Sequence, residues 1–245
     1  MRYAIFGDIH GNLDALNTVL ENIEKEKPDG YICVGDIVGY GANPNECIER
    51  VRALNNCHIV AGNHDLAASG VLNIEFFNDY AKKAITWTTS RLSREEINFL
   101  GRLKMARRFD NITAVHSNIY LPELFCYIQS GFDLHMGFIN LENSLCFVGH
   151  SHVPVIFSLN KGMISIIPET TVEFDFNTTK AFINIGSVGQ PRDNNPKAGY
   201  AIYTEHKNKG SLELRRVDYP VEKAMDKILS AGLPPILAER LKYGQ

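Results

Sequence analysis

The first 65 residues alternate short apolar runs with amphipathic stretches, in the order of a β-α-β-α-β unit. The apolar runs are 3–7, 31–34 and 58–61, and leucine, isoleucine and valine recur at helical spacing over 13–23 and 48–54. The run 31–34 is apolar throughout, as is typical of a parallel strand covered on both faces. This pattern predicts an α/β fold that begins with a parallel sheet.

Polar side chains follow each of these three strands. The first strand stops at Asp8 and His10, the second at Asp36, and the third at Asn63 and His64. Ligands of parallel sheets bind beyond the carboxyl ends of the strands. We therefore expect these side chains to share one edge of the sheet.

Two later apolar runs end in the same way. The run 112–115 is followed by His116, and the run 145–148 is followed by His150 and His152. A single histidine at a strand end is usually a hydrogen-bonded turn residue, and a single aspartate is usually a helix N-cap. Five such turns in one chain, carrying five of its eight histidines, predict a metal site instead.

The rest of the chain predicts one domain over residues 1–245, with a β-rich second half packed on the first. Residues 66–103 are expected to be helical, including 80–92 and a helix that starts at the capping box Ser93-Arg94-Glu95-Glu96. The aromatic segment 119–143 predicts a cap-like insertion on the substrate side. The remaining patterns predict a hairpin over 107–115, strands at 155–159, 163–167, 171–176, 181–185, 199–203 and 211–217, and helices at about 220–231 and 234–242.

The residue types indicate which metals are expected. Imidazole and carboxylate ligands favour manganese, iron or zinc over calcium or magnesium, and the absence of a thiolate argues against a structural zinc site. The candidates exceed one tetrahedral site and fit two ions about 3.5–4 Å apart that share a carboxylate. Two such ions would lower the pKa of a shared water and provide hydroxide near neutral pH. The candidate ligands are Asp8, His10, Asp36, Asn63, His116, His150 and His152.

Composition limits the alternatives. The formal net charge of −3 gives no strong signal for nucleic-acid binding. No segment resembles a signal peptide or a membrane span, so no membrane partner is expected. The five cysteines are odd in number and form no C-x-x-C pair, which predicts reduced thiols in a cytoplasmic protein.

The five turns, in this order and spacing, resemble those of the calcineurin-like metallophosphoesterase superfamily. The motifs that carry the resemblance are Gly7-Asp8-Ile9-His10, Gly35-Asp36, Gly62-Asn63-His64-Asp65, His116 and Gly149-His150-Ser151-His152. The length and the loop Gly186-Ser187-Val188-Gly189-Gln190-Pro191-Arg192 look like its small bacterial and archaeal phosphodiesterase branch. The resemblance implies a four-layer αββα sandwich of two mixed β-sheets flanked by helices.

The resemblance also implies roles for individual residues. Asp8, His10, Asp36 and His152 would hold the first metal, and Asp36 would bridge to a second metal held also by Asn63, His116 and His150. His64 would be the catalytic residue, as an acid near the leaving group or as a stabiliser of charge on the phosphoryl oxygens. A hydroxide that bridges the metals would attack phosphorus in line.

Two departures separate the chain from the phosphoprotein phosphatases. Gly39 stands where those enzymes carry the aspartate that orients the catalytic histidine, and Tyr40 stands where they carry a phosphate-gripping arginine. The third motif ends in Asp65 rather than glutamate, and we interpret Asp65 as a turn carboxylate. Asn12 is either a phosphate contact or a helix cap. Arg192 is a candidate substrate-binding residue, with a surface position as its alternative.

The sequence thus predicts a metal-dependent phosphoric ester hydrolase. Its expected substrate is a small phosphodiester, phosphomonoester or nucleotide polyphosphate. The alternatives are a protein phosphatase or an exonuclease of the same superfamily, and a non-catalytic scaffold for protein interactions. The scaffold alternative is disfavoured because His64 and all seven ligands are present.

Overall fold

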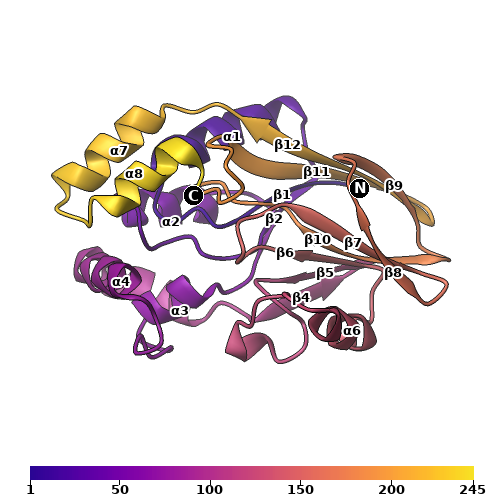
Figure 1. Cartoon of the computed structure of the whole chain (residues 1–245). Helices are drawn as coiled ribbons and strands as arrows, with labels where there is room; N and C mark the ends of the chain where they lie inside the picture. Colours follow the sequence, from indigo (N-terminus) through magenta and orange to yellow (C-terminus); the bar gives the residue numbers. More distant parts are fainter.

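The computed structural model covers residues 1–245 and contains two six-stranded sheets (Figure 1). The strands of the first sheet are β1 Arg2–Phe6, β2 Gly30–Cys33, β3 Cys57–Ile59, β9 Thr171–Asp175, β11 Ala198–His206 and β12 Lys209–Val217. Their order is β3-β2-β1-β11-β12-β9, with β1 to β3 parallel and the other three added antiparallel.

The second sheet is built from the middle of the chain. Its strands are β4 Ala106–Phe109, β5 Ile112–Val115, β6 Leu145–Val148, β7 Val155–Asn160, β8 Met163–Ile167 and β10 Thr179–Asn184. Their order is β4-β5-β6-β10-β7-β8, with β5, β6 and β10 parallel. The second half of the chain thus also completes the first sheet, to which it adds β9, β11 and β12.

The helices follow the apolar periodicity of the sequence. They are α1 Leu13–Lys25, α2 Pro44–Arg52, α3 Asn63–Ala68, α4 Asp79–Arg91, α5 Arg94–Gly101, α6 Gly131–Asn140, α7 Val221–Ser230 and α8 Ile236–Tyr243, with the 3₁₀ turn η1 Pro122–Leu124. None of these helices combines the length and the apolar character that a membrane crossing requires.

Residues 69–78 were expected to be helical but form a loop between α3 and α4. Helix α3 ends because Gly70 adopts a positive φ of 80°, a conformation that ends helices. Helix α4 starts afresh at Asn78, whose side chain accepts a hydrogen bond from the backbone N–H of Ala81. The capping box predicted at Ser93 is present at the start of α5.

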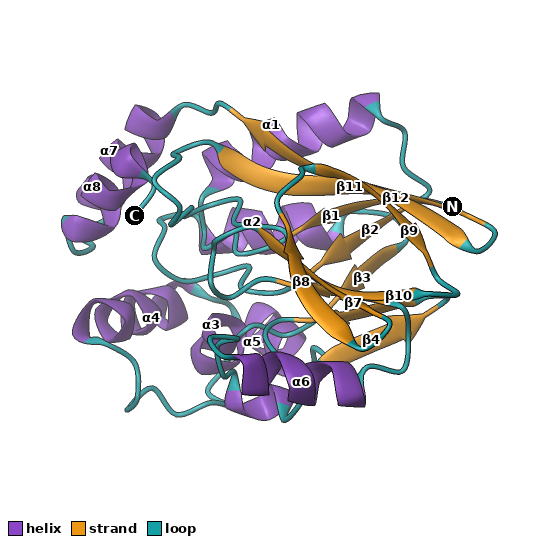
Figure 2. Ribbon diagram, turned by 45° about the vertical axis from the view of Figure 1, so that its right-hand side comes forward, coloured by secondary structure: helices purple, strands orange, loops and turns teal.

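Four layers result, which confirms the αββα sandwich (Figure 2). One apolar cluster lies between the sheets and includes Ile5, Phe147 and Tyr203. A larger cluster joins the first sheet to the helices outside it, and a third, which includes Phe138, joins α6 to the second sheet. In β2, Ile32 belongs to the cluster between the sheets and Cys33 to the cluster under the helices, as a strand covered on both faces requires.

The segment 119–143 contributes η1, a loop and α6. Because α6 packs on the second sheet, this part of the segment forms the fourth layer of the sandwich. The division of the chain into domains stays a prediction. The turns after the parallel strands meet across the two sheets, since the backbone N–H of His150 in the second sheet donates to the carboxylate of Asp8 in the first.

Candidate metal centre

Most of the predicted ligands lie on strained backbone. Asp8, His10, Asp36, His150 and His152 all adopt positive φ, between 48° and 67°. Residues with side chains rarely adopt this conformation, and where they do so in a cluster the strain commonly serves a functional site. The conformation turns each side chain inward at the end of its strand.

Four predicted ligands form one compact group. The ligand atoms of Asp8, His10, Asp36 and His152 all lie within 4.8 Å of one another, and all four residues are buried. His10 Nε2 and His152 Nε2 are 3.0 Å apart although they come from opposite ends of the motif series.

A second group shares Asp36 with the first. The ligand atoms of Asp36, His116 and His150 also lie within 4.8 Å of one another. His116 Nε2 and His150 Nδ1 are 3.2 Å apart. Asn63 starts α3 at the same cavity, and its buried side-chain oxygen has no hydrogen-bond partner.

The side chain of Asp36 lies between the two groups. Its Oδ2 is 3.5 Å from His10 Nε2 of the first group and 3.3 Å from His116 Nε2 of the second. Its Oδ1 accepts a hydrogen bond from the backbone N–H of His64 at 2.8 Å. The position of Gly62 requires glycine, because a methyl group there would lie 2.0 Å from Asp36 Oδ1.

Backbone carbonyls fix the orientation of three imidazoles. The Nδ1 atoms of His10, His116 and His152 donate to the carbonyls of Val38, Val34 and Gln190, at 3.2, 2.7 and 2.6 Å. A carbonyl can only accept, so each Nδ1 carries a proton and each Nε2 is left as the atom free to bind a metal.

Burial keeps most of these imidazoles neutral. It lowers the pKa of His10 and His152 well below the usual range and lowers the pKa of His150 to about 3. Burial also opposes charge on His116, but the nearby carboxylates of Asp36 and Asp8 raise its pKa to about 9. A cation held by the same carboxylates would displace that proton, because metal ligands must be deprotonated.

These observations fit a metal site. Neutral His10 and His152 direct two lone pairs at each other over 3.0 Å, which is unfavourable unless a cation lies between them. The amide oxygen of Asn63 accepts no hydrogen bond within the protein and is free to act as a further metal ligand. Imidazole, carboxylate and amide ligands of this kind suit manganese, iron or zinc.

His64 lies beside the two groups but belongs to neither. Its ring packs edge-on against His10 at 4.8 Å and Phe77 at 5.2 Å, and tilted against Tyr40 at 4.5 Å. Its Nδ1 is buried without a hydrogen-bond partner, and burial lowers its pKa to about 4. Packing between rings, and no carboxylate, therefore orients this imidazole.

Two other residues have structural contacts. Asp65 is buried, and its carboxylate accepts hydrogen bonds from the backbone N–H groups of Ile37, Val38 and Gly62, which matches the interpretation as a turn carboxylate. Asn12 caps α1, since its Oδ1 accepts from the N–H of Ala15. Its amide also donates to the carbonyl of Gly189 and the hydroxyl of Tyr219, so helix capping is the alternative that the structure favours.

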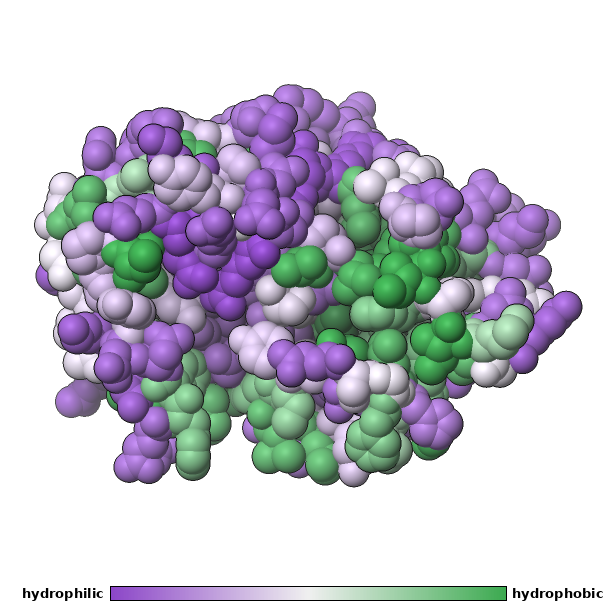
Figure 3. All heavy atoms as spheres, viewed as in Figure 1, coloured by the Kyte–Doolittle hydropathy of each residue, from purple (hydrophilic) through white to green (hydrophobic).

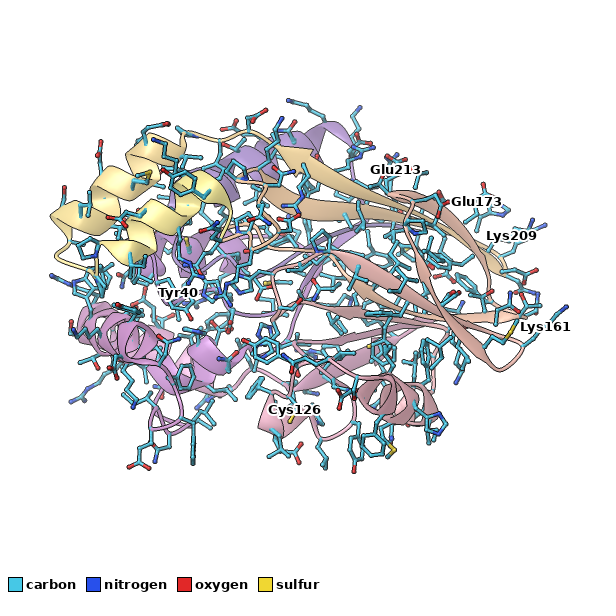
Figure 4. All side chains as sticks on the ribbon, viewed as in Figure 1. Tyr40, Cys126, Lys161, Glu173, Lys209 and Glu213 are labelled. Carbon is cyan, nitrogen blue, oxygen red and sulfur yellow. The ribbon has the colours of Figure 1, made fainter.

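A cavity of about 460 Å³ opens beside the two groups of candidate ligands. Arg192 lines it, with Nη2 donating to Gln190 Oε1 and a buried Nε that has no partner. Its guanidinium also lies 5.8 Å from the ring centre of Tyr40, which Figure 4 labels. Arg192 is thus placed to meet an anion in the cavity.

The sequence revealed the outer wall of this cavity only in part, through the substrate-side segment predicted over 119–143. Phe76 and Phe77 lie in the loop 69–78, and Glu123 and Leu124 lie in η1. For the loop 69–78, the one available signal was the pair Phe76 and Phe77, which interrupts the apolar periodicity of the helix predicted there. The glycine-rich loop also contributes more than Arg192, because Ser187 Oγ donates to the carbonyl of Asp8.

Comparison with known proteins agrees with this site. The family model described as calcineurin-like phosphoesterase matches residues 1–154. An uncharacterised protein of Methanocaldococcus jannaschii is 40% identical over 247 residues, which cover 99% of this chain and 98% of that protein. The crystal structure of a metallophosphoesterase from Sphaerobacter thermophilus is 35% identical with a TM-score of 0.84, and the match covers 100% of this chain and 99% of that one.

A shorter match involves an enzyme with a named substrate. A symmetrical bis(5'-nucleosyl)-tetraphosphatase of Baumannia cicadellinicola is 32% identical over 118 residues, which are 46% of this chain and 41% of that protein. The family match covers more than half of the chain and includes all five polar turns. The chain therefore belongs to the calcineurin-like phosphoesterase family.

Proposed function

We propose that this protein is a dinuclear metal-dependent phosphoesterase that hydrolyses small phosphate esters. The observation that carries the proposal is the pair of ligand groups joined by Asp36, whose Oδ2 lies close to imidazoles of both. Asp8, His10, Asp36 and His152 would hold one ion, and Asp36, Asn63, His116 and His150 the other. Manganese, iron or zinc at these positions would activate water and neutralise charge on the phosphoryl group.

The side chains around the metal centre have separate tasks in this proposal. Arg192 lines the cavity and binds a non-bridging phosphoryl oxygen through its guanidinium. His64 faces the same cavity and is not a metal ligand. It stabilises the charge that develops on the oxygens or gives a proton to the leaving group.

Two features favour a small substrate over a phosphoprotein. Gly39 and Tyr40 replace the aspartate and arginine expected of a protein phosphatase, and the ring of Tyr40 closes the cavity beside His64. The partial relative from Baumannia acts on a nucleotide, which supports a small phosphorylated substrate of this kind. The five free cysteines fit our proposal of a cytoplasmic enzyme.

The proposal is tested by metal reconstitution. The metal-depleted protein is loaded with manganese, iron or zinc, and hydrolysis of p-nitrophenyl phosphate and bis(p-nitrophenyl) phosphate is measured with metal content. We expect two bound ions per chain and activity only in the loaded protein. Asp36→Asn should lose both ions, whereas Asp79→Asn, a change to an exposed aspartate at the start of α4, should keep them.

Two results would contradict the proposal. Full loading of Asp36→Asn with two ions would remove the bridging role of Asp36. A loaded wild-type protein that hydrolyses neither ester with any of the metals would favour the scaffold alternative.

A further inference from the structure

The cavity beside the metal centre has two chemically different ends. Asp36, Asn63 and His150 form its inner end, where the phosphoryl group would bind under the function proposed above. Phe76 and Leu124 line the outer part, and their side chains are 94% and 60% exposed. Apolar groups so open to water at the mouth of one cavity offer a surface that a ligand can cover.

Aromatic rings connect the two ends. Tyr127 stacks on the imidazole of His150, with ring centres 4.1 Å apart and planes 24° from parallel. Phe77 packs against the ring of His64. Phe76, the residue before it in the same loop, is more exposed than Phe77. A planar group attached to a phosphate at the metal centre would therefore meet ring faces on its way out of the cavity.

The charges of the cavity limit how many phosphates the ligand carries. Arg192 is the one lysine or arginine that lines it, whereas Glu123 adds a carboxylate at the outer part. Each further phosphate would extend negative charge from the metal centre toward the carboxylate of Glu123. A chain of several phosphates would lack the cations that such ligands need.

We infer that this cavity binds an ester of a single phosphoryl group with a planar aromatic group of nucleobase size, and that Phe76 stacks on that group. The inference rests on the proposed phosphoesterase function and narrows its substrate. It disfavours dinucleoside polyphosphates even though a partial relative carries that activity in its name.

The test compares substrates that differ only in the base. The manganese-loaded protein is given thymidine 5'-(methyl phosphate) and 2-deoxyribose 5-(methyl phosphate), two diesters, and AMP and ribose 5-phosphate, two monoesters. Diadenosine tetraphosphate is the polyphosphate arm. We expect the base to raise kcat/KM at least about tenfold in the pair that is hydrolysed. Calorimetry should show the same preference in binding of AMP over ribose 5-phosphate.

Variants locate the preference. Phe76→Ala should reduce the base-dependent ratio by about tenfold, and Phe76→Tyr should keep the ratio. Phe132→Ala removes an exposed phenylalanine of α6 that does not line the cavity and is the matched control.

The outcomes separate the two levels of the proposal. Equal rates with and without a base, an unchanged ratio in Phe76→Ala, or preferred hydrolysis of diadenosine tetraphosphate would overturn the inference while the phosphoesterase function stands. Failure to hydrolyse any of these substrates would contradict the proposed function itself.

An independent feature is the exposed edge of the second sheet. Strand β8 ends that sheet, and Met163, Ile164 and Ile166 are 73%, 38% and 63% exposed. Figure 3 shows a large hydrophobic area on the face of the molecule over β7 and β8. Long apolar edge strands are normally protected, because they pair readily with other strands.

The turn before β8 determines which backbone groups are free. Lys161 and Gly162 both have positive φ, as in a two-residue type I′ hairpin that makes Asn160 and Met163 a hydrogen-bonded pair. Pairs alternate in an antiparallel ladder, so Ile164 and Ile166 direct their N–H and C=O groups away from β7. Two alternate positions with both groups free can pair with another strand.

The sequence of β8 is complementary to itself. An antiparallel pair of β8 strands centred on Ser165 places Ile164 opposite Ile166 of the other copy, so that the free backbone groups face each other. Extended beyond the ends of β8, the same register brings Lys161 of the hairpin turn toward Glu169 of the other copy, and both residues are exposed. Figure 4 shows Lys161 projecting at the tip of the hairpin.

We propose that β8 pairs with β8 of a second copy of this chain and forms a continuous sheet through a two-fold dimer. Sedimentation velocity across micromolar concentrations should show a dimer for the wild type. Ile166→Lys should give a monomer with an unchanged circular dichroism spectrum, whereas Ile139→Lys, at an exposed apolar position on α6, should stay dimeric.

Charge reversal tests the register. Lys161→Glu and Glu169→Lys should each raise the dimer dissociation constant about two- to fivefold at low salt, and the double variant should restore it. A monomeric wild type, or a dimer that persists in Ile166→Lys, would overturn the proposal. Single reversals without effect would overturn the register centred on Ser165.

Discussion

Gly39 allows the imidazole of His64 to occupy its place beside the metal groups. Its φ is +95°, and a methyl group at this position would lie 2.5 Å from His64 Nδ1. We predict that Gly39→Ala displaces the ring and lowers kcat by about ten- to a hundredfold, because the group proposed to be catalytic loses its position. Metal content should stay at the wild-type level, since Gly39 is not among the ligands. Steady-state kinetics with elemental analysis would check both.

Gly70→Ala is the matched control for this change. Gly70 also has a positive φ, +80°, but no atom lies within 4 Å of the position a methyl group would take. This variant should show the backbone cost alone, of about 1 kcal/mol in the free energy of unfolding, without a loss of kcat. Equal losses of kcat in both variants would mean that general destabilisation, and not displacement of His64, explains the effect.

At the scale of single residues, the sequence was most informative about the candidate metal site. The ligands follow strands directly, so strand ends and residue types were enough to predict that seven side chains converge. Phe76 was not predicted as a cavity residue, because its loop carries no periodicity that places it relative to distant strands. The orientation of His64 was also not predictable, since it depends on rings that the fold brings together.

Asp14 connects α1 to α7, two helices that are more than 200 residues apart in the sequence. Its nearly buried carboxylate contacts the ammonium groups of Lys223 at 3.1 Å and Lys227 at 2.5 Å. Burial opposes its charge, but these two ammonium groups outweigh it and hold the pKa of Asp14 below its usual range. We predict that Asp14→Asn lowers the free energy of unfolding by about 1 kcal/mol at neutral pH.

The pH dependence of this effect has a definite sign. A carboxyl whose pKa is lowered by folding stabilises the protein above its unfolded pKa of about 3.9, and this contribution is lost as the pH falls through the folded pKa. Urea unfolding should therefore show a difference between wild type and Asp14→Asn at neutral pH that shrinks in acid. Asp226→Asn on α7, an exposed aspartate without an ion pair, should match the wild type at both pH values. A constant difference at all pH values would refute the ionic explanation.

The elements themselves were largely predictable, and their ends less so. Apolar spacing in α1 and α4 and the capping box of α5 predict helices that the structure contains. The loop 69–78 was missed because helical residues flank it closely on both sides. Where helical patterns lie so close together, a loop between two helices cannot be recognised unless the conformation of a residue such as Gly70 is known.

The arrangement of the whole molecule was predictable only through the family resemblance. Periodicity predicts that β11 is a strand but cannot tell that it pairs with β1, nearly 200 residues earlier. The sandwich depends on many such distant pairings. The residues that follow the strands could thus be predicted to converge without a prediction of which strands pair in each sheet.

The metal centre joins the two sheets, so its occupancy should affect the stability of the whole molecule. Asp8, His10 and Asp36 follow strands of the first sheet, and His116, His150 and His152 follow strands of the second. An ion held from both sides binds the folded state alone and stabilises it by mass action. We predict that chelation lowers the Tm by about 5–10 °C for ions present at a hundredfold excess over their Kd. Differential scanning calorimetry with and without chelator would measure the shift, which Asp36→Asn should lack. A wild-type protein that binds two ions without any change in Tm would show that the ions do not couple the sheets.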